Sequence, residues 1–379
     1  MKKWKLTLII ALLATVNTLF SQEVTTLASI ESNYGDGMII TPEGDILVSG
    51  GFNKTNILKI TLEGEVTEHV TGLLGPVGMG FDSDGNLYVS NYTGNTISKV
   101  TPEGTITEFA SDLDGPAGLI VTENDEILVT LFGANFSGTG STVLKFDLEG
   151  NSEIYASGNG ILDAIGITVD ENQDLFITNF VGGNVIKVDT AQNIETIATV
   201  AGAQINQIVY SNEYVYIPSP NLRMIYRVNT GDGSVEHFAG SGGSSTTDGE
   251  LLEAEFNFPN SCTVNEAGDT LYVLDGQVGL IRAIDLETLG LNDSENTIGV
   301  KLFSNPQNDS ITIQATLINA QKYTVSVYDT AGQLVKTAEG SIQNGNLQSI
   351  LSTSTWSKGV YVVKIKIGET VVNRKFVKQ

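Results

Sequence analysis

Carboxylate and amide side chains stand at the borders of short apolar runs, and these are the side chains that could do chemistry. Asp36 and Asn260 each precede such a run, whereas Asn91, Asn179 and Asp275 each end one. Their oxygen atoms are the ligands that Ca²⁺ prefers, and they also orient polar ligands through hydrogen bonds. We therefore take these five as candidate ligand-binding residues.

The elements that position these residues belong to a segment that repeats six times. An apolar triplet marks the second strand of each repeat, and the middle residues of the triplets are spaced by 41, 40, 48, 40 and 56 residues. The triplets are 46–48, 87–89, 127–129, 175–177, 215–217 and 271–273. A turn rich in Gly, Asp and Asn precedes most of them, which predicts hairpins of short strands. A period of about forty residues built from short strands is typical of β-propeller blades.

The first five repeats each divide into four strands, which we name A to D from the centre of the ring to its rim. In the second repeat they are expected at 78–81, 86–89, 96–100 and 105–109. The sixth repeat has no evident D strand, but residues 24–28 have the pattern of one. We predict an all-β chain with a six-bladed β-propeller over 22–286, closed by an N-terminal strand that covers the edge of the last blade.

The candidate residues fall at one mouth of this ring, because B–C and D–A connections of a meandering blade emerge on the same face. The aligned starts of the A strands are Asp36, Val77, Ala117, Ile165, Ile205 and Asn260, and the aligned ends of the B strands are Gly50, Asn91, Leu131, Asn179, Ser219 and Asp275. Asp36 and Asn260 belong to blades 1 and 6, which ring closure makes neighbours. Two oxygen side chains are fewer than the roughly six to eight oxygens that Ca²⁺ takes. The alternative for Asn91, Asn179 and Asp275 is that they cap turns.

Two long insertions are expected to rise at the same mouth. One spans 132–140, between strands B and C of blade 3, and the other spans 240–255, before strand A of blade 6. Phe136 in the first insertion offers apolar contact area and is the sixth candidate ligand-binding residue. Loops that vary on a fixed scaffold often carry function, and neutral drift of tolerant loops is the alternative.

The sequence offers few side chains suited to catalysis near the mouth, so we expect no catalytic residue. The only histidines, His69 and His237, lie in expected outer strands, which excludes a Ser-His-Asp relay at the mouth. Cys262, the single cysteine, is expected to be a buried core residue. No tryptophan occurs between residues 23 and 296, which disfavours a lectin that stacks sugars.

The charge is unevenly distributed along the chain. Residues 23–296 hold 8 Lys and Arg against 40 Asp and Glu, which argues against nucleic acid as a partner. Three lysines before an apolar run predict a signal peptide over 1–21. No other stretch is long and apolar enough to cross a bilayer, so we expect no transmembrane segment in the mature chain. Residues 287–299 break the strand pattern and form the expected linker.

The repeats resemble the NHL-repeat and gluconolactonase-like six-bladed propellers. The sixth repeat carries this resemblance most clearly, through Phe238-Ala239-Gly240-Ser241-Gly242-Gly243 and the later Phe256-Asn257-Phe258-Pro259. Relatives of the gluconolactonase kind bind a metal near the start of strand A. The resemblance therefore implies Asp36 as one metal ligand and Asn260 as a second. Streptogramin lyases, which are also similar, rely on a central histidine that has no counterpart here.

The last part of the chain resembles the C-terminal sorting domain of the type IX secretion system. The matching pieces include Phe303-Ser304-Asn305-Pro306, the run from Val325 to Val335, and the ending Lys375-Phe376-Val377-Lys378. Ser304 departs from the family, in which proline is usual at that position. The resemblance implies a small β-sandwich over 300–379 that the outer-membrane translocon reads.

These inferences combine into one expected function and two alternatives. We expect an exported, non-catalytic binding or scaffold module that passes through the periplasm and is secreted or displayed on the outer cell surface. Its partner would be a protein or small molecule at the B–C and D–A loop face, with no cofactor or with a divalent metal such as calcium. The first alternative is a metal-dependent hydrolase of the gluconolactonase kind, and the second is a streptogramin-type lyase.

Overall fold

The computed structural model describes residues 22–286, 300–305, 310–316, 322–329, 333–341, 346–367 and 370–378. Residues 22–286 form one compact unit, and the strands from Val300 onward belong to a second. The expected signal peptide (1–21) and linker (287–299) lie outside the described residues. No helix among the described residues is long and apolar enough to span a membrane.

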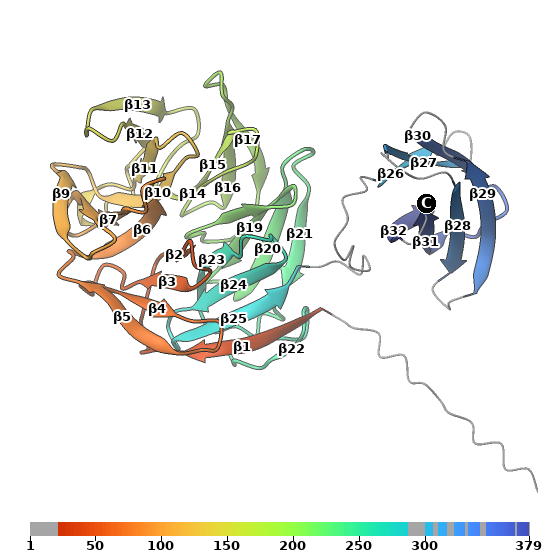
Figure 1. Cartoon of the computed structure of the whole chain (residues 1–379). Helices are drawn as coiled ribbons and strands as arrows, with labels where there is room; N and C mark the ends of the chain where they lie inside the picture. Colours follow the sequence, from red (N-terminus) through yellow and green to blue (C-terminus); the bar gives the residue numbers. More distant parts are fainter. Residues whose placement is uncertain are drawn as a thin grey trace, which may run out of the picture. The chain divides into compact units, whose positions relative to one another are not determined.

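The first unit is a ring of six sheets, each of which begins with an inner strand and ends at the rim. Blades 1 to 3 consist of β2 (Met38–Ile40), β3 (Ile46–Ser49), β4 (Asn56–Ile60) and β5 (Val66–Thr71), then β6 (Pro76–Phe81), β7 (Leu87–Asn91), β8 (Thr96–Val100) and β9 (Ile106–Ala110), then β10 (Pro116–Val121), β11 (Ile127–Leu131), β12 (Thr142–Phe146) and β13 (Ser152–Ser157). Figure 1 shows β2, β6 and β10 near the middle of the ring and β5, β9 and β13 at its rim.

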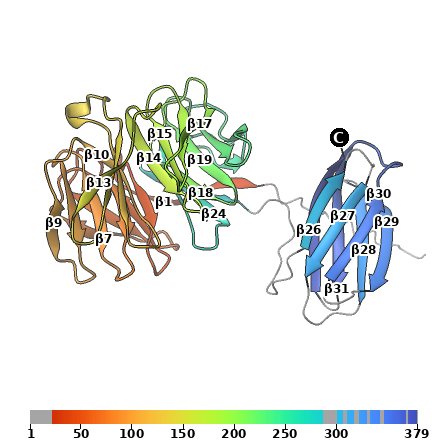
Figure 2. The same ribbon diagram turned by 90° about the horizontal axis from the view of Figure 1, so that it is seen from above.

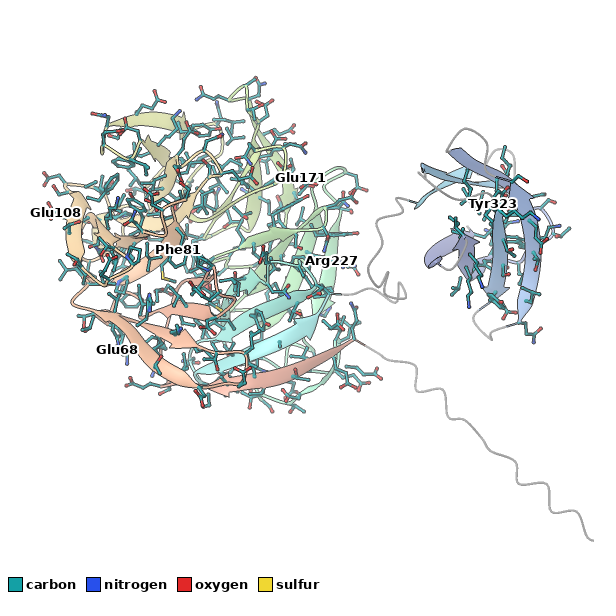
Figure 3. All side chains as sticks on the ribbon, in the orientation of Figure 1. Glu68, Phe81, Glu108, Glu171, Arg227 and Tyr323 are labelled. Atoms are coloured by element: carbon teal, nitrogen blue, oxygen red, sulfur yellow. The ribbon has the colours of Figure 1, made fainter. Side chains whose placement is uncertain are left out.

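The other three blades continue the same order. They consist of β14 (Ala164–Val169), β15 (Leu175–Asn179), β16 (Asn184–Val188) and β17 (Ile194–Thr199), then β18 (Val209–Ser211), β19 (Tyr214–Ser219), β20 (Met224–Asn229) and β21 (Val235–Ala239), then β23 (Pro259–Val264), β24 (Thr270–Asp275) and β25 (Leu280–Asp285). In Figure 3 the side chain of Phe81, at the end of an inner strand, lies near the middle, whereas Glu68 and Glu108 of outer strands lie at the periphery.

The N-terminal strand closes the ring, as the sequence predicts. β1 (Glu23–Ser29) pairs antiparallel with β25, with Val24 opposite Ile284 and Ser29 opposite Leu280. The last blade thereby gains its outer strand from the start of the chain (Figure 1). An edge that would otherwise be open to another chain is covered.

The core is divided among the junctions between neighbouring blades. Six apolar clusters occur in this unit, and each combines residues of two adjacent blades. One cluster joins blades 6 and 1 through Leu274 and Ile281 packed with Ile46 and Val48. Since every blade shares its apolar faces with both neighbours, closing the ring completes two of these clusters.

The insertion before blade 6 holds the closing strand. β22 (Gly249–Glu250) pairs with the start of β1 at its outer edge. Asp248 accepts hydrogen bonds from the backbone and hydroxyl of Thr26, and it forms an ion pair of 2.6 Å with the fully buried Arg282. We predicted that residues 240–255 decorate the mouth. Residues 248–250 instead clasp β1, whereas Gly240 and Gly242 lie against the B–C connection of blade 5.

The second unit is the expected β-sandwich. One sheet contains β26 (Val300–Asn305), β27 (Ser310–Thr316) and β30 (Asn346–Ser352), and the other contains β28 (Lys322–Asp329), β29 (Leu334–Ser341), β31 (Gly359–Ile367) and β32 (Thr370–Lys378). Alternate residues of both sheets, among them Ile313, Leu351, Val325 and Val363, form one buried core. Figure 2 shows the strands of both sheets running lengthwise through this unit.

Candidate functional site

A pocket of about 230 Å³ lies at the predicted mouth, between blades 1 and 6. Segments 33–36 and 50–53 of blade 1 line it, together with Phe258, Asn260 and segment 276–277 of blade 6. These segments are D–A and B–C connections, so the pocket is on the face that the sequence favours. A second cavity of about 520 Å³ opens at the other end of the ring, among Ile40, Phe81, Val121, Val264 and others.

Asp36 and Asn260 lie side by side at the floor of the mouth pocket. The side-chain amide of Asn260 donates hydrogen bonds to the carbonyl oxygen of Gly35 at 2.7 Å and to Asp36 Oδ1 at 3.3 Å. Burial raises the pKa of the Asp36 carboxyl to about 6, although hydrogen bonds from the Phe52 backbone and from Asn260 oppose this rise. The structure thus brings together the two residues that were proposed as metal ligands.

The residue of blade 5 at the position of Asp36 is Asn206, not Ile205 as the aligned repeats predict. One repeated hydrogen bond marks this position. The side-chain hydroxyl of a B-strand residue in the preceding blade donates to the backbone carbonyl oxygen of the residue there. The pairs are Ser90 with Ala117, Thr130 with Ile165 and Thr178 with Asn206. The prediction was displaced by one residue because the A–B turn of blade 5 is unusually tight. Asn212 and Glu213 form it with φ values of 51° and 69°. Polar side chains therefore occupy the inner-strand start in three successive blades, 5, 6 and 1.

The next position of the inner strand is glycine in blades 1 to 4. A Cβ added at Gly118 would lie 2.1 Å from the carbonyl oxygen of Ile165, and one at Gly37 would lie 2.1 Å from that of Val77. Neighbouring inner strands approach so closely there that only glycine fits. The backbone N–H of each of Gly37, Gly78 and Gly118 also donates to a hydroxyl of its own B strand, from Ser49, Ser90 and Thr130.

Blades 5 and 6 depart from this pattern, with Gln207 and Ser261 in place of glycine. Gln207 Nε2, Ser261 Oγ and the neighbouring Asn260 Oδ1 are all buried without a hydrogen-bond partner among the described residues. The inner strand of blade 5 pairs only from Val209 onward, and the backbone N–H of Gln207 donates instead to the carbonyl oxygen of Asn260 at 3.3 Å. The glycine of the repeat is therefore replaced in the same two blades that carry these unpartnered polar atoms.

Three of the predicted ligand-binding residues hold loops in place. Asn91 accepts a hydrogen bond from the Leu74 backbone and donates to Thr96 and Ser98. Asn179 accepts from the Leu162 backbone and donates to the carbonyl oxygen of Gly160. The carboxylate of Asp275 accepts from the backbones of Asn257 and Phe258, and burial raises its pKa. These side chains fix the D–A connections, as the turn-cap alternative expects.

Phe136 stands at the mouth, as predicted, with 57 % of its surface exposed. It lies in η1 (Ala134–Phe136), and its ring contacts Phe52 and Tyr92 at centroid distances of 5.0 and 4.8 Å. The Tyr92 hydroxyl accepts a hydrogen bond from the Phe136 backbone and donates to the carbonyl oxygen of Gly133. Tyr92 was missed by the sequence analysis, although it follows strand B directly.

The reactive side chains lie away from this mouth. His69 and His237 belong to the outer strands β5 and β21. Cys262 is buried between blades 5 and 6, and burial raises the pKa of its thiol far above the ordinary value. Among the described residues, no group of three or more His, Cys, Asp or Glu side chains is arranged to hold a metal ion.

The comparisons with known proteins identify the tail. Residues 301–379 match the family model of the secretion system C-terminal sorting domain. The protein is exported to the cell surface or the medium. No curated protein matches the sequence.

Solved structures similar to this chain share the propeller. An auxiliary nutrient-binding protein from Bacteroides ovatus has a TM-score of 0.59 at 15% identity, covering 70% of this chain and 76% of that one. A gluconolactonase from Xanthomonas campestris has a TM-score of 0.56 at 13% identity, covering 70% and 89%. Virginiamycin B lyase from Staphylococcus aureus has a TM-score of 0.53 at 13% identity, covering 70% and 99%. At these identities the likeness supports the fold alone.

Proposed function

We propose that this protein is an exported, non-catalytic binding module that takes a small, neutral, polar ligand at the mouth shared by blades 5, 6 and 1. The type IX translocon would read residues 300–379 and deliver it. The observation that carries the proposal is the set of buried, unpartnered atoms on Gln207, Asn260 and Ser261. Leaving such an atom without a partner costs about 1–3 kcal/mol, so a ligand that pairs with it gains that much.

Asn260 lines the mouth pocket, and Gln207 and Ser261 adjoin Asn260 in the inner strands, Gln207 through its backbone hydrogen bond to the Asn260 carbonyl. The chemistry of the ligand follows from the atoms of these three residues. The amide of Gln207 donates, the amide oxygen of Asn260 accepts, and the hydroxyl of Ser261 can do either. This set of one donor, one acceptor and one hydroxyl can form hydrogen bonds with the hydroxyl and carbonyl groups of a ligand. Residues 23–296 carry a net charge of −32, the difference between 8 basic and 40 acidic residues, so an anionic ligand would be repelled.

The hydrolase alternative has weaker support from the residues present. Asp36 and Asn260 supply three side-chain oxygens, two from the carboxylate and one from the amide, and the Asn260 amide nitrogen, not its oxygen, faces Asp36. Calcium takes roughly six to eight oxygens, so this donor set does not fit a tight calcium site. We derive no catalytic step through a metal. The lyase alternative has no histidine at the mouth, because both histidines belong to outer strands.

A thermal-shift screen of the chain from Gln22 onward tests the proposal. The screen contains neutral sugars, polyols and amides, their anionic counterparts, and calcium and zinc salts. The matched variant is Gln207→Gly/Ser261→Gly, which restores the glycine of the other blades. We expect neutral hydroxylated compounds to raise the melting temperature of the unchanged chain but not that of the variant.

Two results would contradict the proposal. One is an equal shift of both proteins by every active compound, which would place binding elsewhere. The other is a shift produced only by a metal and abolished by Asp36→Ala, which would favour the hydrolase. The variant itself should unfold at the same temperature or higher, because it removes two buried polar groups without partners.

A further inference from the structure

A continuous band of aromatic rings crosses the mouth beside the pocket. Ring centroids are separated by 5.0 Å between Phe52 and Phe136, 4.8 Å between Phe136 and Tyr92, 6.2 Å between Tyr92 and Phe132, and 5.9 Å between Phe132 and Phe180. The five residues come from the B–C connections of blades 1 to 4. The band therefore joins four blades on one face.

Part of the band arises from the repeat itself. Tyr92, Phe132 and Phe180 each follow the last residue aligned in strand B, so blades 2 to 4 present an aromatic ring at the same place. Phe52 stands one residue later in blade 1, and Phe136 is supplied by the blade 3 insertion. The fold does not require an aromatic residue at this position, because blades 5 and 6 have Pro220 and Gly276 there.

The exposed ring of Phe136 is held out at a conformational cost. Asn135 and Phe136 have φ values of 54° and 57°, a region in which a bulky side chain is strained. The hydrogen bonds of the Tyr92 hydroxyl to this loop keep it in place. A loop held in such a conformation to display an apolar ring is typical of a binding surface.

The band meets the polar site at the pocket. Phe52 and Phe258 both line the pocket whose floor carries Asp36 and Asn260, and they are 42 % and 36 % exposed. One end of a ligand could therefore lie in the pocket while the rest follows the rings. The only lysine near this end, Lys54, is paired with Glu31 at 2.7 Å. Nothing in the described part of the band would attract an anion.

We propose that the mouth binds a neutral oligosaccharide. Its terminal unit would hydrogen-bond to the unpartnered atoms of blades 5 and 6, and its following units would stack on Phe52, Phe136 and the partly exposed Phe132 and Phe180. This inference rests on the proposed function and extends it to a ligand class. A sugar unit combines hydroxyl groups for the floor with an apolar C–H face for a ring. The exposed Phe rings thereby take the role for which the sequence offers no tryptophan, and the buried Tyr92 supports Phe136.

Binding of the chain from Gln22 onward to a printed array of neutral and acidic glycans tests the proposal, followed by calorimetry on the strongest ligand and its shorter fragments. Affinity should rise from one sugar unit to three or four. Phe136→Ala should weaken the longer ligand about tenfold, the equivalent of about 1.4 kcal/mol, and leave the single unit unchanged. The matched control is Ile154→Ala, a residue 65 % exposed on the outer strand β13.

The outcomes separate this proposal from the one on which it rests. If a single sugar or another small polar compound binds, but length and Phe136→Ala have no effect, the pocket function stands and the oligosaccharide proposal fails. Binding to no glycan, stronger binding to acidic than to neutral glycans, or equal losses in Phe136→Ala and Ile154→Ala each overturn it. A peptide that binds through Phe136 in place of a glycan would overturn it as well.

Discussion

At the scale of single residues, the position of Asp36 next to Asn260 followed from the repeat pattern, whereas their surroundings did not. Ring closure makes blades 1 and 6 neighbours, so aligned residues of these blades must meet. The importance of Gln207 and Ser261 could not be predicted, because the tight turn at Asn212 displaces the alignment of blade 5 by one residue. In the correct alignment, the sequence shows that glycine is replaced at this position in just two blades, and this would have pointed to Gln207 and Ser261.

The raised pKa of Asp36 makes stability depend on pH in a defined direction. The folded protein holds this proton more tightly than the unfolded chain, whose aspartates titrate near about 4. The free energy of unfolding therefore contains a favourable contribution below about pH 4 that is lost as the pH rises through about 6. Asp36→Asn should reduce the loss of stability between pH 4 and 6.5 in urea titrations.

Asp84→Asn, at an exposed turn, is the control for this measurement. Asp84→Asn should show the same pH dependence of stability as the unchanged protein. Asp163 and Asp275 contribute to that dependence in both proteins, because burial also raises their pKa values. The same pH dependence in Asp36→Asn and in the unchanged protein would show that the Asp36 carboxyl is not desolvated.

At the scale of elements, strand order and ring closure were predictable, but the contact between inner strands was not. Periodicity reports which residues are apolar, and it does not report how closely two backbones approach. Gly118→Ala should lower the free energy of unfolding by about 2 kcal/mol or more, because its Cβ would meet the Ile165 carbonyl. Chemical denaturation measures this, with Gly231→Ala at an exposed turn as the control. A loss no larger than that of the control would contradict the close approach.

The insertion before blade 6 was placed at the mouth from its length and from the face on which D–A connections emerge, whereas residues 248–250 of it pair with β1. Asp248→Ala should destabilise the propeller by about 2 kcal/mol, because Arg282 is buried and would lose its charged partner. Glu253→Ala, at an exposed position of the same insertion, should change stability little. The measurement is again denaturation, followed by the rate of proteolysis near residue 22. Equal effects of the two variants would mean that the insertion does not clasp the closing strand.

At the scale of the whole molecule, the two units have separate tasks. The propeller closes its own ring and core, so removal of residues 300–379 should leave it folded. Without the sorting domain it should stay in the periplasm, and cell fractionation with immunodetection measures this. Residues 300–379 fused to a periplasmic reporter provide the complementary control, since the reporter should then be exported. A truncated protein that still reached the surface or the medium would contradict a sorting role for the tail.

The central claim is that the break in the repeat at blades 5 and 6 is a ligand site. A crystal structure of the chain with the compound that most raises its melting temperature tests this most directly. We expect ligand oxygen atoms within about 2.7–3.2 Å of Asn260 Oδ1 and Gln207 Nε2. A ligand in the cavity at the other end of the ring, with only water on these two atoms, would contradict the claim.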